Sequence, residues 1–364
     1  MHAQCSEQVW AALKRYPARS VEHLTAKGGH PMRVLALGGA GYVGGHVVRE
    51  LCDRGHYVAV LDNLSTGHAQ AVRIASRGAA ELIVGDVGDP ALVRDVLRSR
   101  EIDAVMHFAA ASLVGESMSN PSKYWRNNVS CTVELLDAMA WVGVDRIVFS
   151  SSAAVYGEPR QTPIPEDHPK SPTSTYGMTK LAIEHILAGY HSAHGIKSIS
   201  LRYFNAAGAD VSGDIGEDHD PETHLIPIVL KTALGLRQQL SIFGTDYPTP
   251  DGTCLRDYVH VSDLAKAHLA ALERLAGQDG ACAYNLGNGA GFSVRDVLRC
   301  AEKVVGRPIP AAEDQRRPGD PAVLVASSQL AQSQLGWQPA QASLEHIIAS
   351  AWAWHSAAPG GYGG

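Results

Sequence analysis

The chain has 364 residues, of which 45% are hydrophobic and 19% are charged, and its formal net charge at pH 7 is −6. This is the composition of a globular protein with a core of ordinary size, and the length suggests two domains. No basic stretch is interleaved with aromatic residues, so neither nucleic acid nor an anionic membrane is expected as a partner.

The six cysteines are widely separated and include no C-x-x-C pair. This spacing predicts neither a metal site nor a disulfide framework. No apolar run reaches the length of a membrane span, and the first 31 residues lack the apolar segment of a secretory signal. We therefore expect a cytoplasmic protein with reduced thiols.

Residues 1–31 differ from the rest of the chain, and we expect them to form a disordered extension. A short amphipathic helix over Ser6–Tyr16 is conceivable, but Gly28, Gly29 and Pro31 break the chain after it. The first strand begins beside Met32, which makes this methionine a candidate for the true start of translation. At the other end, residues 359–364 are expected to be a flexible tail.

From residue 32 onward, apolar runs alternate with segments of helical period. Buried strands are predicted at Arg33–Leu37, Tyr57–Leu61, Leu82–Val84, Ala104–Phe108, Arg146–Phe149 and Ser198–Leu201. Helices are predicted at Tyr42–Arg54, Pro90–Arg98, Tyr124–Ala140 and Tyr176–His194. This alternation predicts an α/β fold, namely a Rossmann-type, doubly wound parallel sheet with helices on both faces.

The alternation weakens after residue 204, where loops rich in Gly, Pro and Asp begin. We therefore predict a Rossmann-type domain over residues 32–204. A smaller mixed α/β domain over residues 205–364 is expected to be interleaved with it.

The first predicted strand runs directly into a G-x-G-x-x-G pattern formed by Gly39, Gly41 and Gly44. Glycines at this spacing allow a tight turn and a close approach of backbone N–H groups to a pyrophosphate. The N-terminus of the following helix adds a partial positive charge. A glycine pattern alone is weak evidence, but the strand before it and the helix after it favour a dinucleotide site.

The second predicted strand is followed by Asp62, at the distance at which a carboxylate binds the ribose hydroxyls of NAD and repels the 2′-phosphate of NADP. The alternative is that Asp62 only begins the turn that ends at Gly67. Asp86 follows the third strand and is placed to meet the adenine, although it too could be a turn residue.

Two further segments are candidates for chemistry. Ser150, Ser151 and Ser152 end a strand, at the edge where open α/β sheets bind ligands. Tyr176 and Lys180 are four residues apart and therefore share one helix face. A nearby ammonium and the positive nicotinamide would lower the pKa of the phenol toward the range of a general base.

A tyrosine four residues before a lysine is common in proteins, and alone it would indicate only a surface pair. After a glycine-rich turn and a serine cluster at a strand end, the functional interpretation becomes the better one. The sequence thus predicts an NAD-dependent enzyme that works through Ser152, Tyr176 and Lys180.

With these motifs the chain resembles the extended short-chain dehydrogenase/reductase family. Within that family it is most similar to the enzymes that epimerise UDP-glucose and UDP-galactose at C4. The resemblance runs from Met32 to about Gly361. It is carried by Gly38–Gly44, Asp62–Ser65, His107–Ala110, Val114–Ser117, Ser150–Gly157, Leu201–Asn205, Asp246–Thr249, Arg256–His260, Tyr284–Gly287 and Arg316–Asp320.

The resemblance implies a bound NAD that is not consumed, in a homodimeric enzyme. Tyr176 would take the proton of the sugar 4-hydroxyl with Ser152 bridging, and Lys180 would hold the nicotinamide ribose. The 4-keto sugar would then turn over in the pocket and recover its hydride on the other face. The residues implied to contact NAD are Gly38, Gly41, Tyr42, Val43, Gly44, Asp62, Asn63, Ser65, Thr66, Gly67, Asp86, Val87, Phe108, Ala109, Ala110, Ser112, Asn127, Ser150, Tyr176, Lys180, Tyr203 and Phe204.

In the second domain the resemblance implies a site for the UDP-hexose. Arginine suits this role because its planar fork meets phosphate oxygens in pairs. For Arg256 and Arg317 the alternative is a surface salt bridge with a neighbouring aspartate, Asp257 or Asp320. The residues implied to bind substrate are Ser152, Asn205, His224, Leu225, Phe243, Arg256, Arg317, Asp320 and Leu324.

Four residues depart from the usual pattern of the family. Leu37 replaces a threonine before the glycines, Ser112 replaces a lysine of some members, and His224 replaces an asparagine of others. Leu324 lies at a position of the sugar pocket that carries either tyrosine or a small residue.

Other functions are alternatives to this one. A 4,6-dehydratase would need acids beside the serine, where Ala153 and Ala154 stand instead. A uronate epimerase or decarboxylase remains open, because the motifs do not identify the contacts that recognise the C6 substituent of the sugar, and an epimerase of N-acetylated UDP-sugars remains open as well. A non-catalytic NAD sensor would have no use for Ser152, Tyr176 and Lys180.

Overall fold

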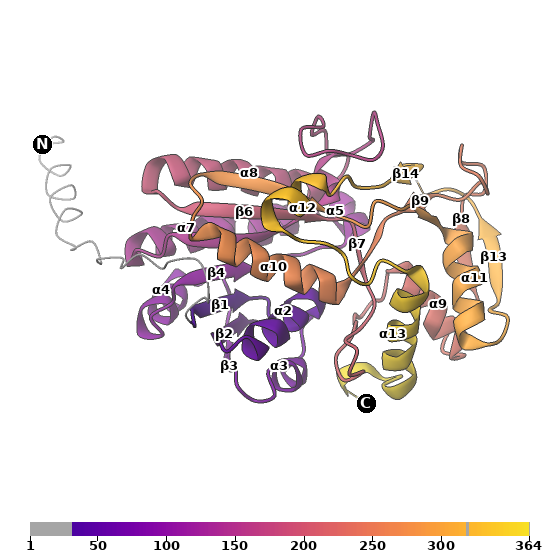
Figure 1. Cartoon of the computed structure of the whole chain (residues 1–364), viewed down its shortest axis with the longest axis horizontal. Helices are drawn as coiled ribbons and strands as arrows, with labels where there is room; N and C mark the ends of the chain where they lie inside the picture. The colour runs from indigo at the N-terminus through magenta and orange to yellow at the C-terminus, as the bar shows by residue number, and fades with distance from the viewer. Residues whose placement is uncertain (1–30, 318–319, 364) are drawn as a thin grey trace, which may run out of the picture. The chain divides into compact units, whose positions relative to one another are not determined.

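The computed structural model describes residues 31–317 and 320–363 (Figure 1). The helix considered for Ser6–Tyr16 lies outside the described residues, as does almost all of the predicted extension. No helix of the described part of the chain is long and apolar enough to cross a membrane.

The centre of the fold is a seven-stranded parallel sheet with the strand order β11-β6-β5-β4-β1-β2-β3. The six strands predicted from the sequence are all present, and the parallel α/β fold is confirmed. The seventh strand comes from beyond residue 204 and pairs with β6. The strands are β1 (Arg33–Leu37), β2 (Tyr57–Asp62), β3 (Glu81–Val84), β4 (Ala104–His107), β5 (Arg146–Ser152), β6 (Lys197–Tyr203) and β11 (Ala281–Leu286).

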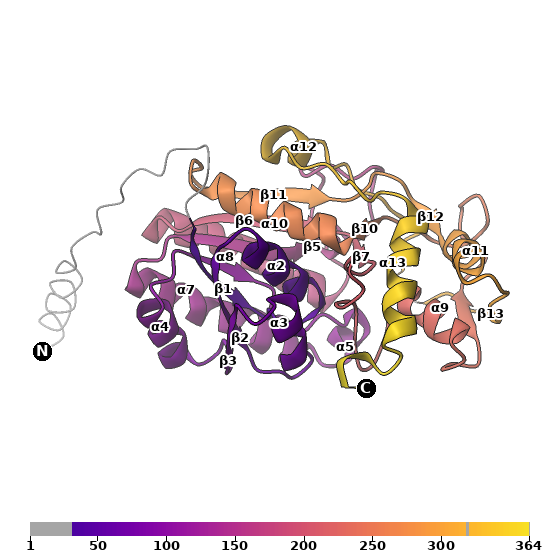
Figure 2. The same ribbon diagram turned by 60° about the horizontal axis from the view of Figure 1, so that its bottom comes forward.

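Helices cover both faces of this sheet, because alternate residues of each strand point to opposite sides. Val34 and Ala36 of β1 belong to one core, formed with α2, α3, α10 and α12, whereas Leu35 and Leu37 belong to the other, formed with α4, α7 and α8. Figure 2 shows this layered arrangement. The helices are α2 (Tyr42–Asp53), α3 (Ala69–Ala75), α4 (Pro90–Ser99), α7 (Cys131–Val142), α8 (Thr175–His194), α10 (Val261–Leu275) and α12 (Gln329–Leu335).

The continuous helix predicted over Tyr124–Ala140 is wrong in one respect. Its first residue, Tyr124, ends α6 (Pro121–Tyr124), which follows α5 (Val114–Ser119). The predicted range then continues as a π-helical turn, η1 (Trp125–Ser130), and only after it becomes α7. A π turn has no signature in the apolar period, and such turns are frequent at functional sites.

The rest of the chain forms a smaller mixed α/β region with its own core, in which α9 and α13 contact α11. Its pairs are β10 with β7, β9 with both β12 and β14, and β13 with β8. The elements are β7 (Asn205–Ala207), α9 (Leu225–Ala233), β8 (Leu240–Phe243), β9 (Leu255–Arg256), β10 (Tyr258–His260), β12 (Phe292–Ser293), α11 (Val294–Val305), β13 (Ala311–Asp314), β14 (Val323–Leu324) and α13 (Leu344–Ala357), with the 3-10 turn η3 (Gly361–Gly363). A second 3-10 turn, η2 (Ala153–Val155), follows β5 in the large sheet.

The flexible tail expected over residues 359–364 is wrong for its described part. The ring of Tyr362 lies 4.8 Å from that of Trp354 and 5.2 Å from that of His68, and its backbone N–H donates to Asp218. A composition rich in glycine predicted flexibility, but one aromatic anchor is enough to dock the tail.

A buried ion pair fastens α8 to the sheet. Arg202, in β6, donates two hydrogen bonds to Glu184 of α8, at 2.8 and 2.5 Å, and a third to the hydroxyl of Tyr156. The two charged side chains are only 4% and 9% exposed. Ser151 of β5 also donates to Glu184. The catalytic candidates on α8 therefore owe their position to a satisfied charge network inside the protein.

We expect Arg202→Met to lower the free energy of unfolding by about 3–5 kcal/mol, because it leaves the Glu184 carboxylate buried without its partner. Arg299→Met is the matched control, since it breaks an exposed pair with Asp296 that should contribute at most about 1 kcal/mol. Urea denaturation followed by circular dichroism measures both. Similar small losses in the two variants would show that the ion pair does not anchor α8.

Candidate active site

The predicted site residues gather at the carboxyl ends of the parallel strands. β1 pairs with β2 on one side and with β4 on the other, so the strand order reverses beside β1. In open α/β sheets the crevice at such a switch point is where ligands bind. The segments after β1, β2, β3, β4, β5 and β6 all carry residues of the predicted NAD set.

The glycine-rich turn is packed so closely that side chains are excluded. A Cβ atom on Gly44 would lie 2.3 Å from the carbonyl oxygen of Gly38, and one on Gly38, whose φ is +77°, would lie 2.5 Å from the nitrogen of Ala109. Gly41 precedes α2 and supplies no side-chain cap. The first N–H groups of α2, from Tyr42 to Gly44, therefore remain available to an anion, which fits a pyrophosphate.

Asp62 stabilises the turn that begins after β2, as the alternative interpretation of this residue expects. Its carboxylate accepts hydrogen bonds from the backbone N–H groups of Ala40 and Leu64, at 3.0 and 2.8 Å. Each oxygen has a second lone pair, so these bonds leave capacity for ribose hydroxyls. Asn63 donates to Asp86 at 2.8 Å, which joins the ends of β2 and β3. The turn continues through Ser65, Thr66 and Gly67, followed in the next loop by Val87.

The loop after β4 is held by a residue that the sequence analysis missed. Asn128, in the π turn, accepts from the backbone N–H of Ala111 and donates to its carbonyl oxygen, and its amide also donates to Thr179 of α8. Its neighbour Asn127 donates to the Asn128 side chain. These bonds tie the loop after β4, which contains Phe108, Ala109, Ala110 and Ser112, to the π turn at Ala111, and the π turn to α8 at Thr179. Asn128 is a polar residue in a helical segment, and its burial (1% exposed) is the signal of its structural role. This burial is known only from the structure.

The three reacting candidates come together as predicted. Ser152 is the last residue of β5, and Tyr176 is the second residue of α8. A Cβ atom on Gly177 would lie 2.4 Å from the carbonyl oxygen of Ala154, so the start of α8 approaches the turn after Ser152 closely. Ser152 forms a hydrogen bond with Tyr176, and its oxygen accepts the N–H of Ala154.

Lys180 lies behind Tyr176 on the same helix face. Its ammonium nitrogen is 5.7 Å from the centre of the Tyr176 ring and donates to the carbonyl oxygen of Ser150 at 2.7 Å. The side chain is 2% exposed. Burial lowers the pKa of Lys180 to about 7, against the partly compensating charge of Glu184.

The expected depression of the tyrosine pKa is not produced by the protein alone. Burial raises the pKa of Tyr176, and the hydrogen bond with Ser152 acts in the opposite direction without cancelling this effect. The charge of Lys180 is not among the causes that shift the pKa of Tyr176.

Tyr203 and Phe204 complete the sheet edge. The Tyr203 hydroxyl is hydrogen-bonded to Ser150, and the ring of the buried His268 lies between Tyr203 and Phe108, at 5.8 and 5.0 Å between ring centres. Sequence reasoning missed His268, because nothing near it in the chain has a recognisable motif.

The predicted substrate residues form two groups. In the first, Leu324 of β14 pairs with Arg256 of β9 and packs beside Tyr156, while the backbone N–H of Asn205 donates to the residue after Arg256. In the second, the guanidinium of Arg317 lies 4.0 Å from the centre of the Phe243 ring.

The partners expected in the alternative interpretation of Arg256 and Arg317, Asp257 and Asp320 respectively, are wrong. Arg256 pairs with Asp320 at 3.3 Å, whereas Asp257 is buried and accepts the backbone N–H groups of Asn288, Gly289 and Ala326. Arg317 stacks on Phe243 instead. Adjacent residues on a strand point to opposite sides, which is why Asp257 cannot reach Arg256.

His224 and Leu225 lie at the start of α9. The Nδ1 atom of His224 is engaged with Glu217, a contact that the sequence did not indicate. The side chain of His224 is nevertheless 51% exposed, so part of the imidazole remains accessible.

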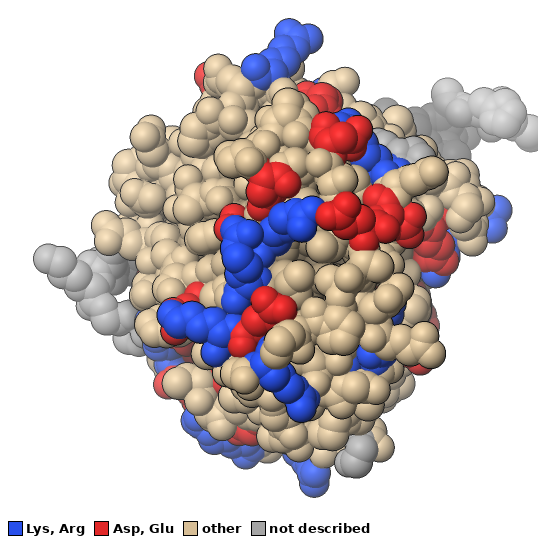
Figure 3. Space-filling model, turned by 90° about the vertical axis from the view of Figure 1, so that its right-hand side faces the viewer, with Lys and Arg blue, Asp and Glu red and all other residues tan. Residues whose placement is uncertain are grey.

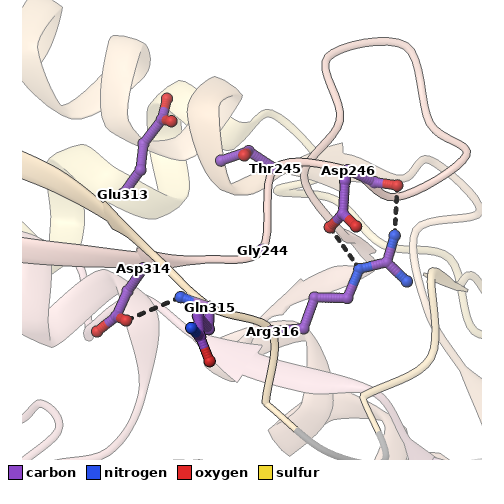
Figure 4. A pocket seen from close by; sticks show the side chains of 7 residues that line it. All are labelled: Gly244, Thr245, Asp246, Glu313, Asp314, Gln315 and Arg316. Carbon is purple, nitrogen blue, oxygen red and sulfur yellow. Dashed lines mark hydrogen bonds and ion pairs between the residues drawn. The ribbon is translucent and has the colours of Figure 1, made fainter.

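A cavity of 660 Å³ lies next to the second group (Figure 4). It is lined by residues 244–246 and 313–316, which directly follow Phe243 and precede Arg317. Asp246 holds the guanidinium of Arg316, with Oδ1 2.6 Å from Nε. This cavity contains none of the reacting candidates. On the face shown in Figure 3, acidic and basic side chains are mixed along a narrow band.

Comparisons with known proteins agree with this geometry. The profile of the NAD dependent epimerase/dehydratase family matches residues 34–287. The UDP-glucose 4-epimerase of Halalkalibacterium halodurans is 51% identical over 91% of this chain and 98% of its own length. That of Streptococcus mutans is 51% identical over 91% and 99%.

Solved structures show the same likeness. The UDP-glucose 4-epimerase of Bifidobacterium longum in complex with NAD+ and UDP has a TM-score of 0.87 and 40% identity, and it covers 90% of this chain and 99% of its own. The Brucella ovis enzyme in complex with NAD has a TM-score of 0.85 and 45% identity, over 88% and 97%. The chain belongs to the NAD-dependent epimerase/dehydratase family.

Proposed function

We propose that this chain is an NAD-dependent UDP-glucose 4-epimerase, which interconverts UDP-glucose and UDP-galactose. The observation that carries the proposal is the hydrogen bond between Tyr176 and Ser152, with Lys180 behind the ring, at the strand ends that face the glycine-rich turn. Relatives about half identical to this chain over nine tenths of its length have this activity.

Bound NAD supplies a hydride acceptor and the positive charge that the site lacks. The residues that fit it are the glycine-rich turn, Asp62, the loop after β4 and Lys180. Because burial raises the pKa of Tyr176, the phenol is a poor base in the protein alone. The positive charge of bound NAD would favour the phenolate form that a general base requires.

Ser152 and Tyr176 transfer the proton of the sugar 4-hydroxyl. The Ser152 oxygen already accepts the N–H of Ala154, which leaves its own hydrogen free to point to the phenol oxygen. As the sugar C4–H bond breaks, Tyr176 takes the hydroxyl proton through Ser152, and it returns the same proton when the 4-keto sugar is reduced. Lys180, held by Ser150, positions the pair for both directions.

The substrate would be bound by the second region of the chain. Arg256 and Arg317 offer forked donors that suit the diphosphate, and Phe243 carries Arg317 on its face. Asn205, His224, Leu225 and Asp320 complete the proposed set. We propose residues 32–204 with β11 as the NAD-binding domain and most of residues 205–364 as the UDP-sugar domain.

Replacing Tyr176 by phenylalanine removes only the ionisable oxygen. We expect Tyr176→Phe to lower kcat for UDP-galactose by about 10²–10⁴-fold while the fold is retained. The matched control is Tyr190→Phe on the same helix, whose hydroxyl only donates to the surface residue Asp137. A coupled assay that detects UDP-glucose measures both variants. If Tyr176→Phe kept turnover within about threefold of the parent, Tyr176 would not be the base.

The range of sugars depends on Leu324, which, like Phe204, packs against the cluster that contains Val155 and Tyr156 of the segment after Ser152. Leucine leaves more room than tyrosine for an acetyl group at C2, but less than a small residue. Burying the acetyl methyl would gain about 0.8 kcal/mol, and a clash would cost about 1–3 kcal/mol. We therefore propose a preference for the plain hexoses with weaker turnover of the N-acetylated pair.

On this account Leu324→Tyr abolishes the activity on UDP-N-acetylglucosamine and spares that on UDP-galactose. Leu324→Met, of similar volume, should keep both activities. Parallel assays with the two sugars measure both activities. Equal loss of both activities in Leu324→Tyr would show that Leu324 does not line the C2 side of the pocket.

We also propose a cytoplasmic homodimer. Met118, Trp125 and Met178 are 61%, 40% and 44% exposed and lie on α5, η1 and α8, and α8 contacts both of the other two elements. Large exposed apolar side chains on adjoining helices favour a partner surface. Sedimentation should give twice the mass of one chain, and the mass of a single chain at micromolar concentration would contradict the dimer.

A further inference from the structure

Four side chains converge between β7 and α9, and of these only His224 belongs to the proposed substrate set. They are Glu217, His219, Glu222 and His224, and each offers one ligand atom within 4.8 Å of those of the others. We propose that these residues, named here the E217–H224 cluster, bind a divalent metal ion of the Zn²⁺ class. The inference concerns the loop before α9 and goes beyond the epimerase activity.

The spacing of the cluster fits a tetrahedral ion. Bonds from zinc to nitrogen and carboxylate oxygen are about 2.0–2.2 Å, which puts neighbouring ligand atoms about 3.3–3.6 Å apart. Nδ1 of His219 lies 3.3 Å from Glu217 and 3.9 Å from Glu222, and Nδ1 of His224 lies 4.0 Å from Glu222. Only the contact between Glu217 and His224 is shorter, so a metal would need to part those two groups by a small movement.

Of the two carboxylates, Glu222 is incompletely compensated without an ion. Their side chains are 3% and 5% exposed, and within the described residues their ion-pair partners are His219 and His224, with no lysine or arginine among them. One oxygen of Glu222, Oε2, is buried and receives no hydrogen bond from any described residue. A buried acceptor without a donor is costly, and a cation would remove that cost.

The chemistry of the donors selects the kind of metal. Two imidazoles and two carboxylates suit Zn²⁺ and its neighbours in the first transition series, whereas Mg²⁺ and Ca²⁺ prefer sets made of oxygen alone. Two carboxylates would also balance the charge of the ion. His219 and His224 are 30% and 51% exposed, which leaves a path for the metal to enter.

The surroundings indicate a structural role. The carbonyl oxygen of Glu217 accepts a hydrogen bond from the indole N–H of Trp354 in α13. The backbone N–H of the neighbouring Gly216 donates a hydrogen bond to the hydroxyl of Tyr362. The ring of His219 lies at right angles to that of Tyr42, 6.2 Å away, at the start of α2. Figures 1 and 2 show α9 and α13 side by side. An ion here would hold in one conformation the loop before α9, which these contacts join to α13, the docked tail and the start of α2.

The four ligands lie within eight residues, in the pattern E-x-H-x-x-E-x-H. The spacing of the cysteines predicted no metal site. The pattern of histidines and glutamates was not recognised as one because it lies in a loop of irregular structure. A loop has no periodicity from which the directions of side chains can be inferred.

The test is metal binding by the full-length protein, freed of metal with a chelator and then titrated with ZnCl₂ in a calorimeter. We expect one ion per chain and a rise in Tm of several degrees at saturation, since the ion binds the folded state alone. Cobalt substitution should give the visible spectrum of an ordered tetrahedral site.

Two ligand variants and one control make the test specific. His219→Gln and Glu222→Gln, which keep size and hydrogen-bonding capacity, should each weaken binding by at least tenfold and remove the Tm rise. His191→Gln breaks another histidine–carboxylate pair, with Asp279, and should bind as the parent does. Equal binding by all three variants, or no stoichiometric binding by the parent, would overturn the proposal.

A second measurement does not depend on the folding of variants. Crystals of the parent grown with ZnCl₂ should show an anomalous peak at the zinc edge between these four side chains. A peak only at exposed histidines elsewhere would contradict the site. Neither measurement requires substrate, so the result is independent of the proposed epimerase activity.

Discussion

The geometry of the active site depends on one buried charge pair. Glu184 and Arg202 join α8 to β6, and the same carboxylate accepts a hydrogen bond from Ser151 of β5. One turn earlier on α8, Lys180 reaches the carbonyl oxygen of Ser150. The helix that carries the proposed base is thus tied by polar bonds to the strand that carries its hydroxyl partner. Such networks are costly when incomplete, so this one holds α8 in a single position.

The burial that orders the site also sets its electrostatics. Tyr176 and Lys180 both move toward their neutral forms, because the pKa of the phenol is raised and that of the ammonium falls to about 7. An empty site of this kind holds little charge. Bound NAD would supply a positive charge beside Tyr176, and this charge would favour the phenolate form. The proposal therefore links binding of the cofactor to activation of the base.

Much of the fold could be predicted because its strands are short apolar runs between helices of regular period. Ser152, Tyr176 and Lys180 could be predicted for a related reason, since a strand end and an i, i+4 spacing fix where side chains point. Asn128 and Arg202 could not, because their importance comes from burial by segments distant in the chain. The partners of Arg256 and the docking of Tyr362 were missed for the same reason: contacts between loops leave no periodic trace in the sequence.

In the proposed reaction the hydrogen removed from C4 returns to C4 of the same sugar, without exchange with water. UDP-galactose that carries deuterium at C4 tests it most directly, with the UDP-glucose formed in ordinary water analysed by mass spectrometry and NMR. The account predicts full retention of deuterium at C4 and no net release of reduced cofactor. Replacement of the deuterium by hydrogen from solvent would contradict a hydride held on the cofactor, and with it the proposed mechanism.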